Sequence, residues 1–447
     1  MDDHVEMPPA QDSPKHILNA LNDDCIQSIF RQMDCVRDFL SAAETCRGFQ
    51  ENAKLTFRTK YRKIRVGELY NKSDNTNTVT VNRLPSLLNI FGHLIVNIYF
   101  DGEELHNDIQ NMIADHCGKT LRTFKICSSN VVNFNTRSPF QALAELEILD
   151  TNIRNFECTS QLRRLVIWGR VSDWEWLIQP FPQLEIVTLY VVHELRFDQA
   201  VEFLKLNPQL KSLYIRLCKQ ITPQIYENIA NLTPNLEKLF VHLHSSSPSL
   251  NEHMLHIGKL QNLRSLAITA RVIIPVGRLI ECLIENKVLI EFLGILNDYT
   301  QFSTSKLNIL ELKQLKKLCI TQMSDETLLE YVKHLPALEE MICVKQDNIR
   351  SISPKISLAG IKKALKYGEH LSALSVDTKD MTIDSDDFKS VLSLAKQNRV
   401  KVTIVIENGT INVPNELLEA NRKWLDVMEN SFLKSLRCQL NIDTWFE

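Results

Sequence analysis

The sequence repeats a six-residue phrase in which the first, fourth and sixth residues are apolar. Twelve such phrases recur at a mean spacing of about 25 residues, and all 36 of these positions are apolar. The phrases begin at Ile95, Leu121, Leu143, Leu162, Leu184, Leu210, Leu236, Leu263, Ile290, Leu315, Leu338 and Leu371. A pattern that returns at a fixed interval predicts an array of similar units, each of which buries its apolar side only against its neighbours. Unrelated strands of an ordinary α/β protein are the alternative.

In one repeat the apolar spacing changes from strand-like to helical. Leu213 and Ile215 are two residues apart, whereas Ile225 and Ile229 are four apart, and Cys218 lies between the two pairs. This order predicts a strand, a turn and a helix in each unit. The stretch resembles the cysteine-containing leucine-rich repeat, although most of the other repeats lack the cysteine.

The resemblance to leucine-rich repeats implies an α/β solenoid with a parallel concave sheet and convex helices. About twelve repeats are expected over residues 91–412. Residues 413–447 are expected to form a helical cap, since Leu417, Trp424 and Leu425 follow Pro414 at helical spacings. A partner-binding amphipathic helix is the alternative interpretation of this last segment.

A different pattern precedes the repeats. Asp23 and Asp24 stand where a helix start favours acidic residues. Apolar residues then follow at the spacing of one buried helical face: Ile26, Ile29, Phe30 and Met33. Further helices are expected over 37–45 and 48–55, so residues 16–60 form a small all-α module. Residues 1–15 are expected to be disordered and residues 61–90 to be a linker leading into the solenoid.

This helical module resembles an F-box. The matching positions are Leu21, Asp23, Ile26, Ile29, Phe30, Met33, Asp38, Cys46 and Arg47. The chain departs from the family pattern with Asn22 for proline, Phe39 for leucine and Phe49 for tryptophan. Because leucine-rich repeats follow, the order of the two parts resembles the F-box and leucine-rich-repeat proteins over nearly the whole chain.

The resemblance implies a substrate-recognition subunit of a Skp-cullin-F-box ubiquitin ligase. The residues expected to dock on the Skp-type adaptor, and through it on a cullin, are Leu21, Ile26, Ile29, Phe30 and Met33. The solenoid would hold an unidentified target protein, and the chain itself would not be an enzyme, because bringing target and ubiquitin-loaded enzyme together suffices. A binding scaffold without ligase function, whose helices merely cap the solenoid, and an enzyme with an unrecognised site are the alternatives.

Alternation along the strands predicts which side chains face the target. The fifth residue of each phrase, and the one after the sixth, point away from the buried side. In the middle repeats this places five large side chains on the concave face: Trp168, Tyr190, Tyr214, Arg216 and Phe240. Such residues dominate interface energetics, so we expect a target-binding stripe there. Cover by neighbouring side chains or by the carboxy-terminal tail is the alternative.

Composition argues against several other partners. Lys and Arg number 51 against 54 Asp and Glu, a net charge of −3, which disfavours nucleic acid. No apolar run approaches the roughly 18 residues of a membrane span. The 11 cysteines are unclustered, which favours reduced thiols and a cytoplasmic or nuclear location. With only 12 glycines, neither GxGxxG nor a P-loop occurs, and no cofactor is expected.

Histidine spacing does not predict a metal site. His242 and His244 form HxH, and His253 and His256 form HxxH, but neither pair has third and fourth ligands at zinc spacing. An HExxH motif that begins at His193 fails at its last position. No metal is therefore expected.

Overall fold

The structure is a computed structural model, and it divides into two compact units, residues 1–161 and 162–447. It describes residues 21–67, 75–102, 105–128, 132–133, 140–151, 153–154, 156, 160–169, 174–190, 195–216, 222–243, 250–270, 276–297, 308–321, 323–344, 356–407 and 410–429. The expected disordered segment 1–15, Cys218, His193, His244 and the chain after residue 429 lie outside this part.

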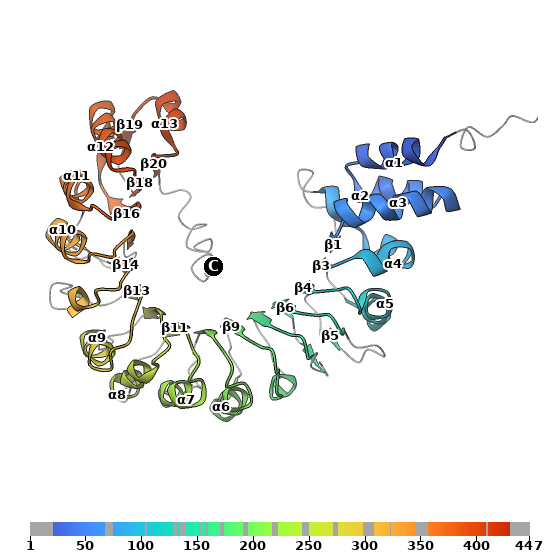
Figure 1. The fold of residues 1–447 in the computed structure, drawn as a ribbon, viewed down its shortest axis with the longest axis horizontal. Helices are drawn as coiled ribbons and strands as arrows, with labels where there is room; N and C mark the ends of the chain where they lie inside the picture. Colours follow the sequence, from blue (N-terminus) through green and yellow to red (C-terminus); the bar gives the residue numbers. More distant parts are fainter. Residues whose placement is uncertain are drawn as a thin grey trace, which may run out of the picture. The chain divides into compact units, whose positions relative to one another are not determined.

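The first unit opens with three helices (Figure 1). They are α1 (Asp23–Gln32), α2 (Val36–Ala43) and α3 (Arg47–Lys60). The side chain of Asn22 caps α1 by accepting a hydrogen bond from the Cys25 amide, 2.8 Å away, which is the role that asparagine fills well at this position. The third helix extends five residues beyond its predicted end at 55.

A parallel sheet follows in the same unit. Its strands pair in the order β2 (Thr78–Val79), β1 (Lys63–Gly67), β3 (Asn97–Asp101), β4 (Thr123–Cys127) and β6 (Glu145–Leu149). The helical elements are η2 (Asn75–Asn77), η3 (Val81–Arg83), α4 (Leu84–Phe91), η4 (Gly92–Leu94) and α5 (Asn107–Cys117), and β5 (Val132–Asn133) pairs with β7 (Ile153–Arg154). Within residues 61–90, which were predicted as a linker or entry to the solenoid, β1 and β2 already pair with the sheet.

The second unit continues the same strand-and-helix pattern in parallel. Its sheet runs β8 (Arg164–Trp168), β9 (Ile186–Tyr190), β10 (Ser212–Arg216), β11 (Lys238–Leu243), β12 (Ser265–Ala270), β13 (Phe292–Asn297), β14 (Lys317–Thr321), β15 (Glu340–Val344), β16 (Ala373–Lys379), β18 (Lys401–Glu407) and β20 (Leu425–Glu429). The connections carry η5 (Glu175–Leu177), α6 (Phe197–Leu206), α7 (Ile225–Leu232), α8 (Leu250–Met254), η6 (Leu255–Lys259), α9 (Val276–Glu285), η8 (Asn308–Glu311), α10 (Asp325–His334), α11 (Leu358–Tyr367), α12 (Ser385–Asn398) and α13 (Asn415–Asn421). A second small pairing joins β17 (Thr382–Asp384) to β19 (Thr410–Asn412).

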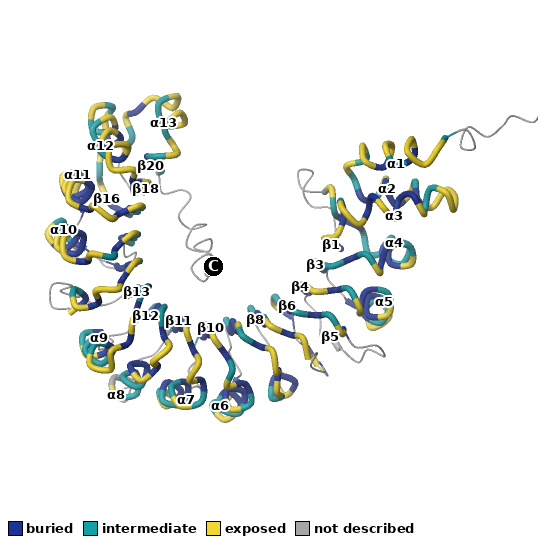
Figure 2. Tube along the Cα trace, viewed as in Figure 1, coloured by how far each residue is buried: buried dark blue, intermediate teal, exposed yellow. Residues whose placement is uncertain are grey.

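Each of the twelve sequence phrases begins two residues before a strand of the sheet. The apolar positions of the phrase are buried toward the helices, as at Leu210, Leu213 and Ile215. Figure 2 shows the same division in the second unit, where helices are buried on the side that faces the strands and exposed on the other. The predicted α/β fold with a repeating parallel sheet and helices on one face is confirmed. We call the sheet face opposite the helices the open face.

The last described residues differ from the helical cap that was predicted over residues 413–447. The helix α13 ends at Asn421, and Leu425–Glu429 forms β20, which pairs with β18, so Leu425 does not continue a helical cap. The sequence prediction missed the strand β18. Arg399 ends α12 in the left-handed region, and the buried residue that precedes the strand, Val400, stands one residue before β18 instead of two as in the twelve phrases. Among the described helices, none is long and apolar enough to cross a membrane.

Candidate functional site

Aromatic side chains from four consecutive strands stack along the open face of the second unit. The ring centroids of Trp168 and Tyr190 are 4.4 Å apart, those of Tyr190 and Tyr214 are 5.8 Å apart, and those of Tyr214 and Phe240 are 4.3 Å apart. These distances follow from the strand spacing of about 4.8 Å, which brings side chains in register into contact. We call Trp168, Tyr190, Tyr214 and Phe240 the aromatic ladder.

The ladder steps by two residues between β9 and β10. The register partner of Tyr214 on β9 is Thr188, a smaller side chain, so Tyr190 lies two residues further along β9 and reaches Tyr214 diagonally. The guanidinium of Arg216 lies over the Tyr190 ring, 4.8 Å from its centroid. The Tyr190 ring therefore contacts a tryptophan ring, a tyrosine ring and a cation. The cation is attracted by the negative face of the aromatic ring.

The ladder is only partly accessible. Trp168, Tyr190 and Arg216 are half-buried, but Tyr214 is 2% exposed and Phe240 is 5% exposed. Of the five side chains predicted to face the target, Tyr214 and Phe240 therefore offer little surface to it, because the rings stacked on them cover their faces. Burial raises the pKa of Tyr214, the neighbouring Tyr190 raises it further, and Arg216 partly offsets both.

The apolar surface continues beyond the ladder. Ala267, Gly294 and Cys319 follow Phe240 in register, and Phe292 lies beside them. A Cβ atom at Gly294 would lie 3.3 Å from the ring of Phe292, so the missing side chain makes room for that ring. Burial raises the pKa of the Cys319 thiol, so this cysteine packs as a small apolar residue. The sequence prediction missed this half of the row.

The open face of the first unit is charged instead. Arg65 pairs with Asp101, and its guanidinium lies 5.1 Å from the centroid of the Tyr99 ring. On the next strands Lys125 and Glu147 form an ion pair of 2.5 Å. Burial raises the pKa of Tyr99, and Asp101 raises it further. These two ion pairs give the open face of the first unit a polar surface, unlike the aromatic ladder of the second.

The helical module packs around aromatic rings. Phe39 contacts Phe30 at 4.7 Å and Tyr61 at 5.1 Å between centroids, and Phe49 contacts Phe30 at 5.7 Å. The two aromatic departures from the F-box pattern, Phe39 and Phe49, thus belong to one core. Phe57 of α3 stacks on Phe91 of α4 at 4.2 Å, which joins this core to the first helix of the repeats.

The five predicted adaptor-binding residues separate into two groups. Ile26 is buried and Phe30 is fully buried within the module. Ile29 is 39% exposed, and Leu21 and Met33 are half-buried. The burial of Ile26 and Phe30 assigns them to the module's core, so only Ile29 on α1 and the flanking residues Leu21 and Met33 retain exposed surface.

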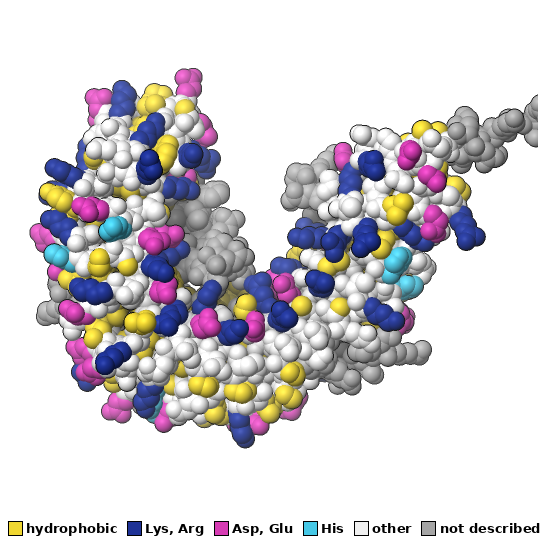
Figure 3. All heavy atoms as spheres, in the orientation of Figure 1, with side chains coloured by type: hydrophobic (Ala, Val, Ile, Leu, Met, Phe, Trp, Pro, Cys, Tyr) yellow, Lys and Arg dark blue, Asp and Glu magenta, His cyan; other side chains and the backbone are white. Residues whose placement is uncertain are grey.

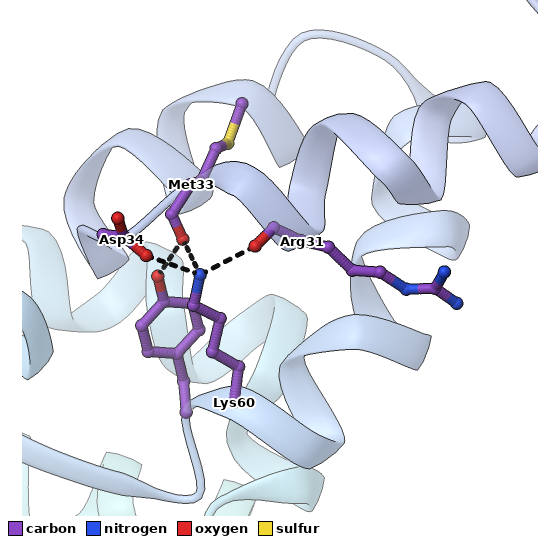
Figure 4. A network of polar contacts seen from close by, with 5 residues as sticks. Arg31, Met33, Asp34 and Lys60 are labelled. Carbon is purple, nitrogen blue, oxygen red and sulfur yellow. Dashed lines mark hydrogen bonds and ion pairs between the residues drawn. The ribbon is translucent and has the colours of Figure 1, made fainter.

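Lys60 joins the end of α1 to α3 (Figure 4). Its ammonium donates hydrogen bonds to the carbonyl oxygens of Arg31 and Met33 and to the carboxylate of Asp34, at 3.0, 2.5 and 3.0 Å. The Tyr61 hydroxyl donates to the same Met33 carbonyl at 2.6 Å. A cation at the carboxyl end of a helix satisfies carbonyls that lack partners within the helix. Burial and the nearby Cys35, Asp34 and Asp38 raise the pKa of Tyr61 to about 12.

Other surfaces have less to offer a macromolecular partner. A cavity of about 230 Å³ lies among Lys333, Tyr367 and His370 at the ends of α10 and α11, away from the ladder. Over the face of the second unit seen in Figure 3, acidic and basic side chains are interspersed, without a field of one sign. His242 lies in register with Arg216 on the open face, whereas His253 and His256 lie on α8 and η6.

No protein-family model matches the sequence, and no curated protein matches it.

Proposed function

We propose that the chain is a non-catalytic substrate-recognition subunit of a Skp-cullin-F-box ubiquitin ligase. The observation that carries the proposal is the exposed Ile29 on α1, an apolar side chain on a compact helical module that precedes a parallel repeat array. An exposed isoleucine that is flanked in the sequence by half-buried Leu21 and Met33 offers an apolar contact that an adaptor would cover.

The target protein is proposed to bind at the aromatic ladder of the second unit. Exposed surface remains on Trp168, Tyr190 and Arg216. The buried rings of Tyr214 and Phe240 continue the same stack and support Tyr190. Rigid aromatic side chains lose little entropy on binding, and tryptophan, tyrosine and arginine supply much of the energy at protein interfaces. An arginine over a tyrosine ring at the edge of the ladder favours a target segment with both apolar and acidic residues.

The adaptor contact is tested by replacing Ile29 with glutamate in the full chain and measuring co-purification of the Skp-type adaptor and a cullin. We expect at least a tenfold loss, because a buried charge without a partner is costly at an interface. Leu55→Glu is the matched control, since Leu55 is a 63% exposed apolar residue on α3 outside the predicted set. Phe30 is unsuitable, because a charge in the core would unfold the module.

The second candidate function is a binding scaffold without ligase activity. The stacking of Phe57 on Phe91 favours it, since a helical cap would share its core with the first repeat in this way. If the unaltered chain and the Leu55→Glu and Ile29→Glu variants all fail to bind the adaptor, the ligase proposal is wrong and the scaffold is favoured. Equal adaptor binding by all three would instead contradict the role of Ile29.

A further inference from the structure

Two histidines and a glutamate from neighbouring repeats converge on the helix side of the second unit. Glu227 lies in the first turn of α7, His253 lies on α8 and His256 lies on η6. One potential ligand atom from each residue lies within 4.8 Å of the others. Glu227 lies 26 residues before His253 in the sequence, so the HxxH spacing of the two histidines could not reveal it.

The distances suit a small divalent ion. Zinc binds histidine nitrogen at about 2.0–2.1 Å and carboxylate oxygen at about 2.0–2.2 Å, so two of its tetrahedral ligands lie about 3.4 Å apart. The Nδ1 atom of His253 lies 3.8 Å from Oε2 of Glu227, too far for a hydrogen bond and close to that ligand separation. Small side-chain rotations would therefore bring the donors onto one ion.

One of the two histidines has a ring nitrogen without a hydrogen-bond partner among the described residues. The Nδ1 atom of His253 is buried and has no hydrogen-bond partner among the described residues, so it is available to a ligand that reaches Glu227 as well. His253 and His256 lie side by side, with ring centroids 6.2 Å apart and planes at 23°.

We propose that Glu227, His253 and His256 form a binding site for a zinc-like divalent transition-metal ion that links α7 to the α8–η6 segment of the next repeat. Two imidazoles and one carboxylate leave a fourth position for water. Lys259, whose ammonium lies 3.0 Å from Nδ1 of His256, opposes the ion by charge repulsion. The site lies on the opposite side of the sheet from the aromatic ladder and is independent of the proposed ligase role.

The test is zinc binding by the full chain, without a polyhistidine tag, after treatment with a chelator and under reducing conditions. Calorimetry should show one site per chain, and Glu227→Gln and His253→Ala should each weaken it at least tenfold. His334→Ala is the matched control, because His334 is an exposed histidine on α10 outside the site. Lys259→Met should bind several-fold more tightly.

A second measurement separates the site from the 11 cysteines, which also attract zinc. Zinc should raise the thermal midpoint of the unaltered chain and of His334→Ala, but not that of a Glu227→Gln, His253→Ala, His256→Ala triple variant. Circular dichroism of the metal-free triple variant checks that it folds. Equal zinc affinity and equal stabilisation in the triple variant, or no zinc binding by the unaltered chain, would overturn the proposal.

Discussion

The sheets of the two units are alike on their buried side and differ on their open side. Both bury the same three phrase positions against helices, as Leu146 does in the first unit and Leu213 in the second. On the open face, the first unit presents ion pairs such as Lys125 with Glu147, whereas the second presents the aromatic ladder. The repeat therefore constrains the residues that face the helices, whereas the open face can differ in chemistry between units of the same fold.

The largest expected effect concerns the apolar positions that both sheets bury against their helices. Leu146→Ala and Leu213→Ala should each cost about 2–5 kcal/mol of unfolding free energy, because each deletes a buried side chain and leaves a cavity. Urea unfolding followed by circular dichroism measures this. A loss below about 1 kcal/mol in either variant would show that the phrase does not have the same role in both units.

Tyr99→Ala and Phe240→Ala test the side that differs. We expect Phe240→Ala to cost about 3 kcal/mol, because it removes a buried ring and its stacking on Tyr214. Tyr99→Ala should cost about 1 kcal/mol, since Tyr99 is only half-buried beside Arg65. The same urea experiment compares them, and equal losses would contradict the distinction between the two faces.

Alkaline pH should weaken the ladder. Because burial raises the pKa of Tyr214 in the folded chain above its usual value of 10.0, the stabilisation by its protonated hydroxyl is complete below pH 10.0 and is lost as pH rises further. The unaltered chain should therefore lose up to about 1.4 kcal/mol per pH unit relative to Tyr214→Phe. Stability measured between pH 9 and 11 checks this, with Tyr99→Phe as the comparison from the charged face. Parallel pH curves for the unaltered chain and Tyr214→Phe would refute it.

The smallest expected effect concerns the ion pairs of the first unit. Glu147→Gln should change the unfolding free energy by less than about 1 kcal/mol, because the Lys125 side chain that it pairs with is 43% exposed and water screens the attraction. The difference should shrink further in about 1 M salt, where screening is stronger. A loss above 2 kcal/mol that persists in high salt would mean that the charged face is a structural element comparable to the ladder.

Much of the fold was predictable because a period-two pattern followed by a helical one allows few arrangements. All twelve predicted phrases precede strands by two residues. The failures occurred where the period was interrupted. The left-handed Arg399 shortens the turn before β18, and Leu425 follows the end of α13 at a helical spacing although it begins a strand.

The candidate sites were less predictable than the fold. Alternation correctly brought Trp168, Tyr190, Tyr214, Arg216 and Phe240 to one face, but it could not show that the rings stack and cover one another. Helical spacing likewise placed Ile26, Ile29 and Phe30 on one helix without separating the two buried residues from the exposed one. Both distinctions depend on neighbours that are distant in sequence.

The sequence by itself determined the repeating parallel α/β fold, the amino-terminal helices and the side of each strand that is buried, since these follow from the spacing of apolar residues along the chain. Only the tertiary structure decided that Tyr214 is enclosed by its neighbours, that Ile29 remains exposed, and that Glu227 lies beside His253. The physical reason is that burial and proximity between repeats depend on the register and side-chain packing of segments about 25 residues apart, which local periodicity does not contain.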